Sequence, residues 1–230
     1  MTAKSQTEVT YEFLRSEVLN GLYEPGSKLK IDAVRAQCNA SPGAVREALS
    51  RLTSDGLVVA LPQRGFIVTP ISAEDLADLT KVRIEIETRC LTDAIKFGDI
   101  TWEGRIQDTL HQLKGTPLQR PDGTQGVNRE WSRVHAAFHD ALIDACGSKW
   151  WLNLRDRMFT QAERYRRLLA TTTGKPRDLL SEHAAIAHAT LDRDVDAACR
   201  LLRDHLQATA DHLLASEALS YPDVAAMEDQ

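Results

Sequence analysis

The sequence predicts a mainly α-helical protein, with a winged helix-turn-helix over residues 1–70, an all-helical bundle over residues 71–220 and a tail over residues 221–230. Three observations support this fold class. Helical patterns and one β-rich hairpin alternate in the first part, apolar residues recur at three- and four-residue steps in the second, and Gly and Pro separate the helical stretches. The 230 residues, 43% of them hydrophobic, are enough for two such cores.

Two helices and a turn are expected before residue 40. A helix over residues 7–22 is amphipathic, because apolar residues recur along it at helical spacing. Its expected buried residues are Val9, Phe13, Leu14, Val18 and Leu22. Pro25 and Gly26 predict a turn, and a short helix follows over residues 32–38 with Asp32 as its N-cap.

The third helix has a signal at each end. Ser41 is a favoured N-cap, Pro42 suits the first helical position because no N–H is needed there, and Gly56 falls just past the end. A buried stripe at helical spacing is formed by Val45, Ala48, Leu49 and Leu52. The side chains left off this stripe are Arg46, Ser50 and Arg51.

A hairpin completes the first part. Two β-rich runs, residues 57–61 and 66–69, are joined by Pro62-Gln63-Arg64-Gly65. The order helix, turn, helix and hairpin is that of a winged DNA-binding domain, so Arg46 is expected in the major groove. Arg64 is expected to enter the minor groove or bind phosphate, and Gly65 allows close backbone approach. The predicted DNA-binding residues are Ser41, Arg46, Ser50, Arg51, Arg64 and Gly65.

Each arginine also has a purely structural interpretation. Arg46 could pair with Glu47 or Asp55 on the helix surface, and Arg64 could be an ordinary hairpin charge. The combination of cap, stripe and hairpin at these separations favours DNA binding over that alternative.

The charge distribution agrees with DNA binding once the net charge of −5 is divided between the two parts. Residues 1–70 carry eight Lys and Arg and seven Asp and Glu, whereas residues 71–230 carry 20 and 26. So few cations predict modest nonspecific affinity for double-stranded DNA, and a homodimer would supply the missing contacts.

The second part begins where Ser72 and Asp75 form a capping box after Pro70. Further helices are expected over residues 73–97, 101–114, 127–146, 149–171, 177–191 and 194–218. No apolar run is long enough to span a membrane and no signal peptide is recognisable, so a cytoplasmic protein is expected. The four cysteines are far apart and predict reduced thiols in the core.

All seven histidines lie in this second part. His135 and His139 are four residues apart and share one helix face, a geometry that can chelate a metal, and His183 and His205 could join them from two further helices. An isolated helical histidine is more often a hydrogen-bonded structural residue, and we assign no function to His111 or His188. His212 shares a face with His205 and is a candidate effector contact.

Residues 7–70 resemble the winged helix-turn-helix of the GntR family. The matching segments are Gly21-Leu22-Tyr23-Glu24-Pro25-Gly26-Ser27-Lys28-Leu29, Val45-Arg46-Glu47-Ala48-Leu49-Ser50-Arg51-Leu52 and Asp55-Gly56-Leu57. In the family an Arg-Thr-Pro usually precedes the Val-Arg-Glu-Ala-Leu segment, whereas this chain has Pro42, Gly43 and Ala44. The first turn therefore offers DNA only backbone N–H groups, and base recognition is expected to depend on Arg46.

Residues 72–216 resemble the FCD ligand-binding domain of the FadR-type GntR subfamily. The matching segments are Val82-Arg83-Ile84-Glu85, Phe138-His139, Cys146-Gly147-Ser148 and Glu182-His183-Ala184-Ala185-Ile186 with Asp194, Ala198 and His205. The resemblance implies a divalent metal held by one Asp and three His, of which His139, His183 and His205 match. The Asp position is His135 here, and four imidazoles suit zinc, nickel or copper better than magnesium, calcium or manganese.

The resemblance also implies a small carboxylate effector and, most often, a repressor. Arg83 is the expected carboxylate clamp, although a salt bridge with Glu87 is an equal alternative. The predicted effector-binding residues are Arg83, Tyr165, Arg166 and His212. The segments around Cys146 and over residues 163–166 most resemble regulators of the breakdown of dicarboxylates or of acids derived from amino acids.

The sequence leaves two alternatives to an effector-controlled regulator: a metal-dependent hydrolase, and a regulator whose metal is purely structural. A metal-dependent hydrolase would need a general base, but Ala136 follows His135 where His-Glu-x-x-His has Glu, and Glu182 is expected to face away from His183. A regulator with a purely structural metal would bind no small acid. We expect no enzyme activity.

Overall fold

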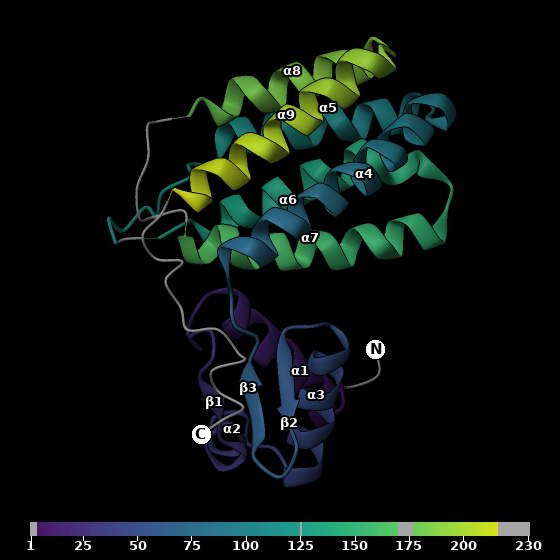
Figure 1. Ribbon diagram of the computed structural model, residues 1–230. Coiled ribbons are helices and arrows are strands. Elements are labelled where there is room, and N and C mark those ends of the chain that lie inside the picture. The colour runs from purple at the N-terminus through teal and green to yellow at the C-terminus, as the bar shows by residue number, and fades with distance from the viewer. Residues whose placement is uncertain (1–3, 125, 170–176, 216–230) are drawn as a thin grey trace.

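A computed structural model describes residues 4–124, 126–169 and 177–215 (Figure 1). It divides into a winged unit, residues 6–68, and a helical unit, residues 73–214. The winged unit contains α1 (Gln6–Leu19), β1 (Lys28–Leu29), α2 (Ile31–Cys38), α3 (Pro42–Ser54), β2 (Val58–Leu61) and β3 (Gly65–Val68). The mainly helical fold with an N-terminal winged helix-turn-helix is thus as predicted.

The ends of α3 confirm the predicted third helix. Ser41 Oγ accepts the Ala44 N–H at 3.2 Å, Pro42 opens the helix, and Gly56 after its end has a φ of +72°, a conformation that favours glycine. The predicted stripe is fully buried in the core that α3 shares with α1. The helix is therefore fixed on its inner face, and the opposite face is left for solvent or a ligand.

Two details of the first helices were predicted wrongly. Val9 on α1 is 46% exposed, because the buried row of this helix runs through residues 10, 14 and 18. Leu22 was predicted on the same helix, but it lies beyond the helix end at Leu19 and is 59% exposed. Asp32 does not cap α2: the N-cap is Lys30, which makes no side-chain cap bond, and the Asp32 side chain is 91% exposed.

The sheet contains a strand that sequence patterns did not predict. It is antiparallel with the order β1-β3-β2, and β1 pairs Lys28 with Ile67 and Leu29 with Phe66. Two residues are too short to show strand alternation, so β1 becomes recognisable only through its partner β3.

The helical unit contains six α-helices among the described residues. They are α4 (Ala73–Phe97), α5 (Ile100–Gly115), α6 (Arg129–Ile143), α7 (Lys149–Leu169), α8 (Leu179–Leu191) and α9 (Val195–Leu214), with a 3₁₀ turn (Asp144–Cys146) after α6. Ser72 caps α4 as predicted, since its Oγ accepts the Asp75 N–H at 3.1 Å. The expected helix ends at residues 171 and 218 and the tail lie outside the described ranges.

The described cysteines are free thiols, as predicted. Cys90 and Cys146 are buried in the helical core, and burial raises the pKa of the Cys90 thiol to about 12. None of the described helices is both long and apolar enough to cross a bilayer.

Helix α7 lies along the side of the helical unit that faces the winged unit (Figure 1). Arg15 of α1 donates to Thr160 Oγ1 at 3.1 Å, and Gln161 donates to the carbonyl of Asp55 at 2.7 Å. Arg167 donates to Asn20 Oδ1 at 3.0 Å. This helix thus joins the two units by side-chain hydrogen bonds.

Candidate metal and effector site

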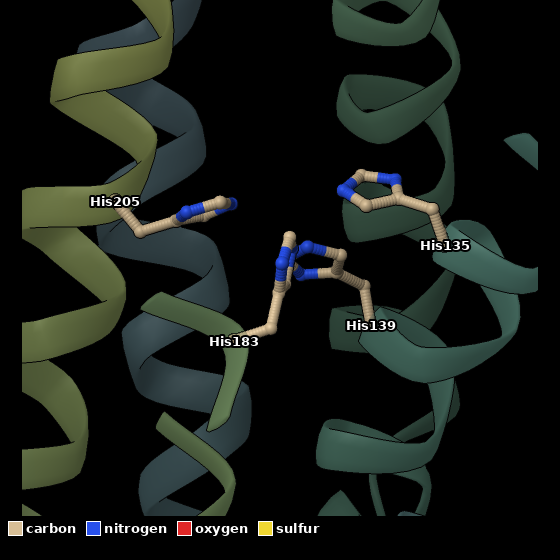
Figure 2. A group of neighbouring side chains, drawn as sticks. All are labelled: His135, His139, His183 and His205. Atoms are coloured by element: carbon tan, nitrogen blue, oxygen red, sulfur yellow. The ribbon is translucent and has the colours of Figure 1, made fainter. Parts of the chain in front are cut away.

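Four histidines from three helices meet in the interior of the helical unit. Helix α6 supplies His135 and His139, α8 supplies His183 and α9 supplies His205, and all four are buried. One ring nitrogen from each lies within 4.8 Å of the others, and Figure 2 shows the four rings converging. The predicted set of four is therefore brought together, whereas His212 lies half-buried further along α9 and is not part of this group.

Hydrogen bonds to residues around the cluster orient two of the four imidazole rings. His183 donates from Nδ1 to the Leu179 carbonyl at 2.6 Å, and His205 donates from Nδ1 to Glu182 Oε2 at 2.7 Å. These bonds place the proton on Nδ1 and leave Nε2 of each ring with a free lone pair. This is the tautomer that a metal-binding histidine needs.

Glu182, which was expected to face away from His183, binds the His205 ring of the neighbouring helix instead. Arg177 holds its carboxylate, and this ion pair together with His205 keeps the pKa of Glu182 near 2 against the opposing effect of burial. The sequence indicated the face of α8 on which Glu182 starts, but not that its side chain reaches α9.

Burial keeps the histidines neutral. It lowers the pKa of His183 to about 3, and burial followed by the neighbouring imidazoles holds the pKa values of His135 and His139 well below the usual 6.5. Neutral imidazole is the metal-binding form. Within the described chain, both ring nitrogens of His139 and Nε2 of His183 are buried without a hydrogen-bond partner. Since such atoms are costly to bury, the residues present fit a metal ion.

Arginines of α7 lie beside the histidines. Phe159 has its ring centroid 6.0 Å from that of His139, and the Arg155 guanidinium lies 4.2 Å from the Phe159 centroid. Arg155 is paired with Asp140, and its Nε and Nη2 are buried without a partner among the described residues, as is Nη1 of Arg166. A carboxylate or another anion would accept N–H groups of this kind.

Sequence reasoning missed Arg155 and Glu163. Glu163 is buried with Oε1 3.7 Å from His135 Nδ1, and its ion pairs with Arg166 and Arg167 lower its pKa against the effect of burial. The available signal was the spacing of Arg155, Phe159, Glu163 and Arg166, which places all four on one side of the helix predicted over residues 149–171.

The other predicted effector residues have different surroundings. Arg83 forms the salt bridge with Glu87 that was the alternative interpretation, at 2.5 Å, although its guanidinium also lies 5.1 Å from the Phe159 centroid. Arg166 donates to Ser132 Oγ at 3.1 Å and to Glu163 at 2.6 Å.

Tyr165 lies at the junction of the two units. It is fully buried, its hydroxyl donates to Asp75 and accepts the Ser72 N–H at 3.2 Å, and burial and Asp75 raise its pKa. Its described hydrogen bonds thus go to Ser72 and Asp75 at the start of α4, not to the histidines.

On the winged unit, Arg46 is exposed and has no hydrogen-bond or ion-pair partner in the described ranges. The alternative that it pairs with Glu47 or Asp55 is wrong, because Thr7 donates to Glu47 at 3.1 Å and Tyr11 to Asp55 at 2.7 Å. A contact between Arg46 and DNA remains a prediction.

The remaining predicted DNA contacts differ in how firmly they are held. Arg51 forms a 2.8 Å ion pair with Glu8 and lies over the Tyr11 ring, so α1 already engages it. Ser41 uses its hydroxyl as the cap, and Ser50 is exposed. Arg64 is exposed in the turn before β3, and Gly65 has a φ of +93°.

Comparison with known proteins links both units to one class. Residues 6–68 match the family described as bacterial regulatory proteins, gntR family, and residues 78–208 match the FCD domain. An uncharacterized HTH-type transcriptional regulator, BphR of Paraburkholderia xenovorans, is 35% identical over 206 residues, which cover 90% of this chain and 84% of that protein. The HTH-type transcriptional repressor GlaR of Escherichia coli is 31% identical over 200 residues, covering 85% and 90%.

A solved structure agrees with the fold. That of Escherichia coli McbR/YncC has a TM-score of 0.76 at 19% identity and covers 92% of this chain and 98% of the other.

Proposed function

This chain belongs to the GntR family of bacterial transcriptional regulators and carries an FCD domain, and we propose that it is a repressor controlled by a small carboxylate. In this proposal residues 1–70 bind double-stranded operator DNA as part of a homodimer. The carboxylate binds together with a metal ion at the histidine cluster in residues 71–220 and lowers the affinity for DNA. The relative GlaR is a transcriptional repressor, which supports this sign of regulation.

DNA recognition is assigned first to Arg46. It is exposed on α3, opposite the buried stripe, and no described side chain competes for its guanidinium. Arg64 and Gly65 in the wing supply backbone or minor-groove contacts. One winged unit offers few cations, so two units on a palindromic site are needed for useful affinity.

The metal assignment is carried by one observation: four buried imidazoles present ring nitrogens within 4.8 Å of one another. An all-nitrogen set favours zinc or nickel over oxygen-preferring ions. A bound metal would supply a cation toward which a carboxylate oxygen is attracted.

A carboxylate suits the arginines beside the histidine cluster. Arg155 and Arg166 keep buried N–H groups that no described residue accepts, and an anion would accept them. Arg83 is held by Glu87 and therefore contributes positive charge more than free donors. The relatives are transcriptional regulators, and we propose no catalysed reaction.

The test is calorimetric titration of metal-free protein, first with Zn²⁺ or Ni²⁺ and then with a panel of mono- and dicarboxylates. The parent is expected to bind one metal per chain and then an acid. His139→Ala should lose both, whereas Arg155→Met should keep the metal and lose the acid.

The acid that binds is then added to a complex with a DNA duplex selected by the parent from a random pool. Release of the duplex is the expected result. Metal binding without acid binding or release would identify the metal as purely structural and overturn the effector assignment.

A further inference from the structure

Glu163 lies between the histidine cluster and the contacts that α7 makes with the winged unit. Its Oε1 is 3.7 Å from His135 Nδ1 and accepts from Arg166 Nε at 2.6 Å. Its Oε2 is 3.4 Å from Arg167 Nε, and Arg167 Nη1 donates to Asn20 Oδ1 at 3.0 Å. One buried carboxylate therefore connects a candidate metal ligand to the winged unit through a single arginine.

The far end of this connection is closely packed. Asn20 is the C-cap of α1, and its side chain donates to Ser16 Oγ at 3.2 Å. At Gly21, which has a φ of +76°, an added Cβ would lie 2.7 Å from Leu168 Cδ2. The residue after Arg167 therefore packs closely against the residue after Asn20, and we expect a shift of Arg167 to reach this turn.

The turn leads directly to the DNA-binding helix. Leu14 and Val18 of α1 share one buried core with Val45 and Leu49 of α3. Because packed cores transmit displacement between their elements, a movement at the end of α1 changes how α3 is presented.

At the histidine end of this connection, His135 and Glu163 are too far apart for a hydrogen bond. His135 Nδ1 is buried with no hydrogen-bond partner in the described part of the chain, and Glu163 is the carboxylate beside it. If Nε2 of His135 binds a metal, Nδ1 must carry the proton and needs an acceptor. Closing the 3.7 Å gap would draw Glu163 toward His135 and weaken its hydrogen bond from Arg167, which at 3.4 Å is the longest hydrogen bond that this carboxylate accepts among the described residues.

We propose that Glu163 is a positioning residue with two effects: it orients His135 for metal binding, and it couples occupancy of the cluster to the winged unit through Arg167 and Asn20. This rests on the proposed metal site.

The test is hydrogen–deuterium exchange of the full chain over residues 16–24, with and without saturating Zn²⁺, alongside Zn²⁺ affinity from chelator competition. In the parent, Zn²⁺ is expected to change exchange in this segment. Glu163→Gln should bind Zn²⁺ roughly 10- to 100-fold more weakly, as is typical on loss of an outer partner of a metal ligand. Even when saturated, this variant should show no change at residues 16–24.

Glu182→Gln is the matched control. Glu182 accepts from His205 in the same cluster, but its hydrogen-bond partners in the described chain are Arg177 and His205, neither of which belongs to α1 or α7. This variant should also bind Zn²⁺ more weakly, yet it should keep the exchange response once saturated. Arg167→Gln should bind Zn²⁺ and lose the response.

The possible failures are distinguishable. A parent that takes up no Zn²⁺ overturns the proposed metal site and, with it, the coupling. A parent that binds Zn²⁺ without any change at residues 16–24 overturns the coupling alone, and so does a normal response in saturated Glu163→Gln or in Arg167→Gln.

Discussion

Replacement of His139 by leucine should separate two contributions to the free energy of unfolding: the cost of burying unpaired imidazole nitrogens and the stabilisation by a bound metal. Both ring nitrogens of His139 are buried without partners in the described chain. Each unpaired buried polar group costs about 1–3 kcal/mol, so His139→Leu removes a penalty of that order for each nitrogen. His139 also loses ring contacts, each worth about 0.5–1.5 kcal/mol and so offsetting the gain, with five rings whose centroids lie 4.5–6.0 Å away: those of His135, Phe138, Phe159, His183 and His205.

The two contributions nearly cancel in the metal-free protein. We expect the stability of metal-free His139→Leu to lie within about 1 kcal/mol of that of the parent. With metal at 100 times its dissociation constant, the parent should gain about 2.7 kcal/mol. For a chain of this size that is a rise in Tm of about 5–10 °C. His139→Leu lacks one of the four ligands and should gain less than half of this.

Differential scanning calorimetry of metal-free and Zn²⁺-loaded samples measures both effects. His188→Leu is the control, because His188 is exposed on α8 outside the cluster and should leave the Zn²⁺ response intact. The reasoning would be refuted by an equal Zn²⁺ response in parent and His139→Leu. It would also be refuted if metal-free His139→Leu were about 2 kcal/mol or more less stable than the parent, the cost typical of an ordinary core truncation.

Three further predictions concern the winged unit and the junction. Arg46→Ala should lower the affinity for the selected DNA duplex roughly 5- to 150-fold, corresponding to about 1–3 kcal/mol. Arg133→Ala, which changes an exposed residue of α6, should leave this affinity unchanged. Fluorescence anisotropy with the labelled duplex measures both, and equal affinities of parent and Arg46→Ala would contradict the role of Arg46. Ser41→Ala removes the cap of α3 and should cost about 1 kcal/mol in urea unfolding, with no loss arguing against the cap. Burial and Asp75 raise the pKa of Tyr165, so the folded state keeps a proton that the unfolded state loses above pH 10, and the free energy of unfolding falls as the pH rises. In Tyr165→Phe this fall should be shallower by up to about 1.4 kcal/mol per pH unit. Identical slopes above pH 10 in the two proteins would exclude this role of Tyr165.

Much of the winged unit was predictable from local signals. The cap at Ser41, the buried stripe of α3 and the hairpin are properties of adjacent residues, and these predictions agree with the structure. The sequence did not indicate features whose deciding partner is distant in the chain. The two-residue β1 depends on β3, and Arg51 is engaged by Glu8 and Tyr11 of another helix.

The sequence by itself determined the helix order, the winged element and the four histidines of the cluster, because periodicity, capping and motif spacing are local or nearly so. The tertiary structure alone decided that Glu182 reaches His205 and that Arg155 and Glu163 lie beside the cluster. It also decided that the Tyr165 hydroxyl binds the start of α4. Long side chains such as Glu and Arg can turn toward either neighbour of a helix face. Which neighbour they meet is fixed only when all the helices of the unit pack together and unpaired charge is excluded from the core.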